Sequence, residues 1–262
     1  MKSQLLRTII SSAKIQFKQS FSRSMFKFSI IVSPIFFGLL MGFIYQNQSP
    51  ENFISFVMIG TATTTMWTSI SFSSAGDIER ERYMGALQQI FNAPQPFYTI
   101  MFGKILGNTL LGSLSMISSF FYIHLFFKIP FIIQQPFLFS IIFILAIVSY
   151  GAVAMMLSGL LAISRQTRTL MNCMDYPVFL LTGSVFPIEL LPAPIQLLSY
   201  TLSPTYAIKL LRYCVSGNYS LKQFLLALLG LLISTLIYYL LSKLIYRFID
   251  QYARQEATLE VI

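Results

Sequence analysis

The most prominent pattern in the sequence is a series of long apolar runs separated by short polar segments. A helix needs roughly 20 mostly apolar residues to cross the hydrocarbon core of a bilayer. Runs of about this length occupy residues 28–45, 53–75, 105–127, 137–163, 170–185 and 221–246. They are continuously apolar, whereas the strands of a membrane barrel alternate. The pattern therefore predicts an all-α integral membrane protein with six transmembrane helices.

Residues 3–26 precede the first run and have a different pattern, because charges recur every few positions. Apolar residues repeat there at steps of three and four, which gives a helix one apolar stripe. The stripe consists of Leu6, Ile10, Ala13, Phe17 and Phe21. We expect an amphipathic elbow helix that lies in the membrane interface. The alternative is a solvated helix that packs on a protein surface.

The composition agrees with a membrane protein and excludes other classes. Of 262 residues, 55% are hydrophobic and 10% are charged, whereas soluble proteins carry roughly 25% charged residues. The net charge of +9 then indicates anchoring among membrane lipids. It does not indicate nucleic-acid binding, which needs a basic soluble face. Cys173 and Cys214 lie at opposite ends of the predicted topology, too far apart for a disulfide.

Lys and Arg concentrate on one side of the predicted topology. They precede the first run, and they occupy the second-to-third connection, the fourth-to-fifth connection and the C-terminal tail. Positively charged connections of this kind stay in the cytoplasm. Both termini are therefore predicted to be cytoplasmic, as an even number of spans requires.

Residues 77–91, in the second-to-third connection, predict a short amphipathic helix. Gly76 and Asp77 offer a helix N-cap, and acidic residues follow in the first turn, where the helix dipole favours them. Tyr83, Leu87 and Ile90 then share one face. Such a face needs a partner, and the pattern leaves two open: the bilayer or another protein.

The second run is unusually rich in hydroxyl side chains. Thr61, Thr65, Thr68 and Ser69 fall on one helical face. Such hydroxyls bond to their own helix or to a neighbouring one, and we favour that structural role over a substrate-lining stripe. At the start of the third run, a GxxxG pair at residues 103 and 107 permits close approach of another helix.

Two features surround the end of the fifth run. Prolines recur within residues 186–220, so a continuous lipid-facing helix would lack backbone hydrogen bonds. We expect broken, re-entrant or interfacial helices on the outer side. Asp175, beside Tyr176, is an ionisable group inside a span, which is a candidate functional site. It either pairs with Arg168 or contacts a cationic substrate or coupling ion.

The chain lacks recognisable catalytic machinery. A phosphate-binding P-loop requires GxxxxGK followed by Ser or Thr, but Gly103 and Lys104 are followed by Ile105. His124 is the single histidine and has no companion with metal-ligand spacing. We therefore expect no catalytic residue, no metal and no cofactor on this chain.

Two stretches give the chain a family resemblance. ERERYMGALQQIFNAPQPFYTIMFGKILG, at residues 79–107, is similar to the E-R-x-x-G-T-L-E-x-L…P…GK pattern of type-2 ATP-binding-cassette (ABC) exporter permeases. PVFLLTGSVFPIELLPAPIQLLSYTLSPTYAIKLLR, ending at Arg212, resembles that family's P-x-x-x-x-S-G-x-x-F-P-x-x-x-L-P…P-x-x-Y-x-x-x-x-x-R stretch. The sequence departs from the pattern at Ala86, Gln88 and Thr182, where Thr, Glu and Ser are usual.

The resemblance implies a transport subunit of the bacterial inner membrane and not an enzyme. It implies a partner ATPase that holds ATP and magnesium, and a second permease copy, identical or paralogous. Residues 77–91 would be the coupling helix. Its coupling residues would be Glu79, Glu81, Tyr83, Gly85, Leu87 and Ile90. A substrate path would include Thr61, Thr65, Thr68, Asp175 and Tyr176.

The expected function is outward transport of an amphiphilic, drug-like, lipid-linked or peptide substrate, powered by that ATPase. The alternative is an ion-coupled carrier or channel that acts without an ATPase. A carrier usually has two matching halves with broken helices in corresponding positions. No convincing repeat relates residues 28–127 to residues 137–246. Neither the substrate nor the choice between identical and paralogous copies can be read from the sequence.

Overall fold

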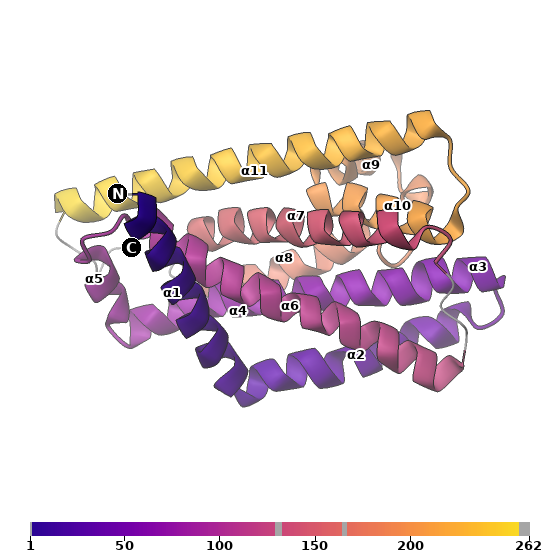
Figure 1. Ribbon diagram of the computed structural model, residues 1–262, viewed down its shortest axis with the longest axis horizontal. Helices are drawn as coiled ribbons and strands as arrows, with labels where there is room; N and C mark the ends of the chain where they lie inside the picture. Colours follow the sequence, from indigo (N-terminus) through magenta and orange to yellow (C-terminus); the bar gives the residue numbers. More distant parts are fainter. Residues whose placement is uncertain (1, 129–132, 164–166, 257–262) are drawn as a thin grey trace.

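The computed structural model describes residues 2–128, 133–163 and 167–256, and every regular element in them is helical (Figure 1). The all-α prediction is confirmed for these residues. In chain order the elements are α1 (Lys2–Ser22), α2 (Ser24–Tyr45), α3 (Pro50–Phe53), the π-helix η1 (Ile54–Ile59), α4 (Gly60–Tyr83), α5 (Ala86–Phe91), α6 (Phe97–Phe127), α7 (Pro136–Ile163), α8 (Thr167–Leu181), the 3₁₀-helix η2 (Ile188–Leu190), α9 (Ala193–Thr201), α10 (Ser203–Ser216) and α11 (Leu221–Glu256).

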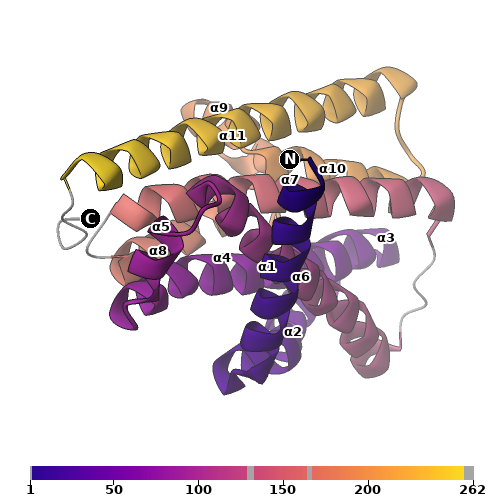
Figure 2. The same cartoon turned by 60° about the vertical axis from the view of Figure 1, so that its left-hand side comes forward.

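The long helices form one elongated bundle whose two ends carry different short elements (Figure 1). The helix α5 and the start of α1 lie at one end, called the α5 end here. The helix α3 lies at the opposite end, called the α3 end. The helix α1 crosses α6 obliquely in both views (Figures 1 and 2). The core is centred on α4, whose Trp67 is fully buried and packs against Tyr150 of α7.

Four helices in the described part of the chain are long and apolar enough to cross a membrane. They cover Phe26–Tyr45, Phe97–Phe127, Pro136–Ala162 and Leu221–Gln251. The predicted run 53–75 corresponds to η1 and α4, which carry many Ser and Thr residues. The predicted run 170–185 corresponds to α8, which has only 15 residues. The six-span count therefore stays a prediction.

Several hydroxyls of α4 bond to their own backbone or to α6, although those of Thr61 and Ser74 are buried without a partner among the described residues. Thr65 donates to the Thr61 carbonyl at 2.9 Å, and its oxygen lies 2.8 Å from the Ser119 hydroxyl. One turn further along, Ser69 and Ser115 are 2.7 Å apart. These pairs hold a polar helix between apolar neighbours without leaving those hydroxyls unsatisfied. The contacts are those of the structural role that we favoured from the sequence.

The helix α1 packs on α6 with its polar side and presents its apolar stripe outward. A Cβ atom added at Gly103 or Gly107 would lie 2.6–2.7 Å from carbonyl oxygens of α1, so only glycine permits this close approach. Leu6, Ile10 and Phe17 are exposed. The apolar stripe is therefore not the face that packs on protein, and its exposure suits a helix lying in a bilayer interface.

Arg212 of α10 holds the α3 end together. Its Nε donates to the Ser55 carbonyl of η1 at 3.2 Å, and its terminal nitrogen donates to the Ser184 carbonyl at 3.2 Å. The guanidinium also lies 4.1 Å from the ring centroid of Phe56. The expected break within residues 186–220 is present as η2, α9 and α10, and Arg212 joins this segment to the beginning of the α4 region.

The glycine contacts give a first prediction. Gly107→Val should separate α1 from α6 at a cost of about 1–3 kcal/mol, because its side chain would overlap the Ala13 carbonyl. Tryptic cleavage at Lys14 and Lys18 in the purified protein should then accelerate. Gly76→Ala is the matched control, because a Cβ at Gly76 meets nothing within 4 Å. Equal cleavage rates for the two variants would contradict this packing.

Candidate functional site

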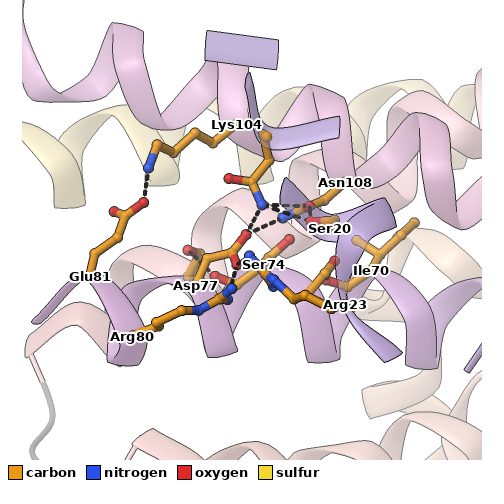
Figure 3. Close-up of polar contacts among 12 residues, drawn as sticks. Ser20, Arg23, Ile70, Ser74, Asp77, Arg80, Glu81, Lys104 and Asn108 are labelled. Atoms are coloured by element: carbon orange, nitrogen blue, oxygen red, sulfur yellow. Dashed lines mark hydrogen bonds and ion pairs between the residues drawn. The ribbon is translucent and has the colours of Figure 1, made fainter. Parts of the chain in front are cut away.

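A buried carboxylate at the α5 end is the centre of the candidate site. The Asp77 side chain of α4 is only 3% exposed. One of its oxygens pairs with Arg23 at 2.6 Å and with Arg80 at 2.5 Å. The other accepts a hydrogen bond from Asn108 of α6 at 2.9 Å and another from Gln16 of α1. Figure 3 shows Arg23, Arg80 and Asn108 gathered around Asp77.

Neutral polar side chains extend the network between α1 and α6. The Gln16 amide also donates to the Ser20 hydroxyl at 2.9 Å and to the Asn108 side-chain oxygen at 3.0 Å. Ser20 donates to the same oxygen at 3.0 Å. Gln16, Ser20 and Asn108 are all buried. Together with Asp77, Arg23 and Arg80 they form what we call the Asp77 cluster, which joins α1, α4 and α6.

The Asp77 cluster carries a net positive charge. Two guanidinium groups face one carboxylate, so the three charged groups sum to +1, and each guanidinium keeps some contact with solvent. Burial lowers the pKa of Arg80 below its usual value, and the neighbouring Asp77 carboxylate opposes that shift. Asp77 is the most buried of the three, and it would be very costly to bury without these partners.

A second ion pair lies beside the cluster. Glu81 of α4 pairs with Lys104 of α6 (Figure 3). The other carboxylate oxygen of Glu81 is buried and has no hydrogen-bond partner among the described residues. Glu81 and Lys104, together with the charged members of the cluster, Arg23, Asp77 and Arg80, line a cavity of about 860 Å³ between α1, α4, α5 and α6. Arg82 is not part of this network and instead donates a hydrogen bond to the Ala162 carbonyl at the end of α7.

The prediction of a single helix over residues 77–91 is wrong. Gly76 and Asp77 lie inside α4, which continues to Tyr83, and no helix begins at them. Asp77 is paired with side chains of other helices and therefore does not cap a helix start. The chain then turns at Met84 and Gly85, and Gly85 adopts the left-handed conformation with φ of 69°. The shorter α5 follows.

The turn separates the residues that were predicted to share a face. Tyr83, at the end of α4, is 92% exposed, and Met84 beside it is 69% exposed. Ile90 of α5 instead packs against the hydrophobic core. The backbones of Glu79 and Leu87 belong to α4 and α5, but their side chains lie outside the described residues. We call Tyr83, Met84 and Gly85 the exposed turn.

The residues predicted for a substrate path are not gathered in one place. Thr61 and Thr65 are buried in α4, and Thr68 is partly buried and donates to the Thr64 carbonyl. Tyr176 of α8 is 70% exposed. The side chain of Asp175 lies outside the described residues, so its pairing with Arg168 stays untested.

The arrangement is suited to holding helices together and not to bond chemistry. No group of three or more potential metal-binding side chains occurs in the part of the chain that the structure describes. The charged groups of the site pair with one another, and the exposed turn carries an aromatic ring and a thioether. A force applied to the exposed turn would pass directly into α4 and, through the Asp77 cluster, into α1 and α6.

Comparison with known proteins decides the family. A family model described as ABC-2 family transporter protein matches residues 46–244. The chain belongs to the ABC-2 transporter family. The match covers both stretches that carried the resemblance, and it begins just after α2. No curated protein matches the chain in sequence.

Family membership fixes the general role of this ABC-2 transporter chain. It is a membrane subunit of an ABC transporter, and the apolar helices agree with a multi-pass membrane protein. Such a subunit is itself a transport component and not an enzyme. The Asp77 cluster of this ABC-2 subunit includes Arg80, from the first of the two stretches.

Sequence reasoning missed most of the Asp77 cluster. Asn108 was available as a signal, because it is a polar amide in an otherwise apolar helical run, whereas Gln16 lies among other polar residues of α1 and does not stand out. Arg23 was counted only as one of the basic residues that set orientation. Their convergence on Asp77 could not be read from the sequence, because Gln16 and Asn108 lie 61 and 31 positions away from Asp77 along the chain.

The cluster gives a second prediction. Asp77→Asn should destabilise the folded protein by about 3 kcal/mol, because it leaves Arg23 and Arg80 facing each other without a carboxylate. The purified variant should therefore show a clearly lower apparent melting temperature. Glu189→Gln, at an exposed carboxylate, is the control and should change stability by less than about 0.5 kcal/mol. Equal melting temperatures would show that the cluster does not stabilise the fold.

Proposed function

We propose that the chain is the permease subunit of an ABC exporter of the bacterial inner membrane. It moves an amphiphilic, drug-like, lipid-linked or peptide substrate outward, and multidrug efflux is one such activity. A separate cytoplasmic ATPase, which holds ATP and magnesium, powers it from the α5 end. The observation that carries the proposal is the exposed turn, which adjoins the Asp77 cluster in a chain of the ABC-2 family.

The exposed turn has the properties of a docking surface. Tyr83 presents nearly its whole side chain outward, and aromatic and Met side chains are enriched in protein interfaces. Gly85 makes the turn sharp, so the ring projects from the end of α4. The turn stands at the end of the bundle where Lys and Arg predict the cytoplasm. An ATPase seated on it would act on α4 without an intervening flexible segment.

Motion of the ATPase would then be passed on by the Asp77 cluster. Salt bridges and hydrogen bonds join α4 to α1 and α6, so the three helices move as one body. The helix α1 lies in the membrane interface with its apolar stripe in lipid. It guides the movement of α1, α4 and α6 during transport. This route needs no ion gradient, which separates it from the ion-coupled carrier or channel considered above.

A second permease copy, identical or paralogous, would complete the path. The helix α8 and the following segment expose large apolar side chains, including Tyr176, Leu180, Leu197 and Leu198. Such a surface suits a partner with the same chemistry. Substrate would pass between the two copies, along α8, which packs against α4.

The docking role gives a third prediction. Tyr83→Asp should abolish co-purification of the ATPase and substrate export, because a charged group would replace an aromatic anchor of the interface. The protein itself should fold normally, since the ring is exposed. Leu221→Asp is the control, because it changes another largely exposed hydrophobic residue, at the α3 end, and should keep the ATPase bound. Export by the Tyr83→Asp variant at the control's rate would overturn the proposal.

A further inference from the structure

A groove between α6, α7 and α11 lies outside the site described above. Its volume is about 430 Å³, and its lining is almost entirely apolar. The residues that line the groove recur at steps of three and four along α6 and at steps of four along α11, so each of these helices contributes one face. The lining includes Phe102, Leu106 and Leu110 of α6, Val148 and Gly151 of α7, and Leu232, Leu236 and Tyr239 of α11.

The groove has the dimensions of a slot for a hydrocarbon chain. On α11 it runs from Leu231 to Tyr239, which is about 12 Å at 1.5 Å per residue. One leaflet provides about 15 Å of hydrocarbon depth, half of the ~30 Å core. The groove therefore fits within a single leaflet.

The end of the groove toward the α5 end has the chemistry of a headgroup site. Tyr239 closes it and packs edge-on against Tyr98 and Phe102 of α6, as aromatic residues do at membrane interfaces. Lys243 and Arg247 follow Tyr239 at steps of four, so they continue along that side of α11 beyond the groove. Both side chains are exposed, and two positive charges there suit an anionic phosphate group.

We propose that this groove holds one acyl chain of a resident anionic phospholipid, whose phosphate lies against Lys243 and Arg247. Apolar contact with lipid alone would not select a site, because the surrounding lipid tails are equally apolar. Selection comes from two features together: the concave slot, which surrounds the chain on three sides, and the basic pair at its end. The lipid fills the space between α6, α7 and α11 and sets how closely α11 can approach.

The test begins with the slot. Val148→Trp and, from the opposite wall, Leu236→Trp place a large ring at the rim of the groove, where both native side chains are exposed. Native mass spectrometry of the gently purified protein should find about fivefold less retained phospholipid in both variants, since the space would be overfilled. Ile144→Trp is the matched control. It lies one turn away on α7, is equally exposed and does not line the groove.

The second arm tests the headgroup with defined probes. Titrated with phosphatidylglycerol or phosphatidylethanolamine, the wild-type protein should prefer the anionic lipid. Lys243→Gln with Arg247→Gln should reduce that preference by about fivefold for each base removed. Lys222→Gln, at the other end of α11, should leave it unchanged. The two arms together separate a lipid held by its chain and phosphate from one held by general apolar contact.

Three results would overturn the proposal. They are equal lipid retention by Val148→Trp, Leu236→Trp and Ile144→Trp, absence of an anionic preference in the wild-type protein, and cysteine cross-linking between two copies through position 148. The last result would mean that the groove receives a second chain. None of these readouts depends on ATP hydrolysis or export, so failure here leaves the exporter proposal standing.

Discussion

The buried Asp77 carboxylate is the interaction on which the α5 end depends. A carboxylate that is 3% exposed is tolerable only where cations and hydrogen-bond donors surround it. Gln16, Arg80 and Asn108 supply them from α1, α4 and α6, and Arg23 supplies another from the junction between α1 and α2. The requirement is partly mutual, because the buried Asn108 amide nitrogen donates to Asp77 and has no other partner among the hydrogen bonds described above. One carboxylate thereby determines how α1, α4 and α6 sit against one another.

This constraint explains the inverted character of α1. In a soluble protein an amphipathic helix packs its apolar stripe on the core. Here Gln16 and Ser20 face α6, and Leu6, Ile10 and Phe17 face outward. Close packing on Gly103 and Gly107 lets the polar groups reach one another. The exposed apolar stripe suits a helix that lies in a bilayer interface, while the opposite side of α1 is part of a buried polar network.

Much of the fold followed from the sequence because it depends on local quantities. Length and hydropathy located α2, α6, α7 and α11, and the prolines predicted the breaks around α9 and α10. The GxxxG pair correctly indicated a close helix approach. The error at Asp77 has a clear cause. A glycine followed by an acidic residue is found at the start of a helix, and the same pair occurs inside a helix when the acidic side chain pairs with another helix. Only the positions of Gln16 and Asn108 distinguish these cases, and they are a tertiary property.

The central claim is that α1, α4 and α6 move as one body when the transporter works. Spin labels at Gln19→Cys on α1 and Gly76→Cys on α4 test it, because Gln19 is exposed and a side chain at Gly76 meets open space. The distance between the labels can be measured by pulsed electron paramagnetic resonance in the assembled complex, without nucleotide and with ATP trapped. The account predicts one narrow distribution that is the same in both states. A distance that changes between them would contradict it.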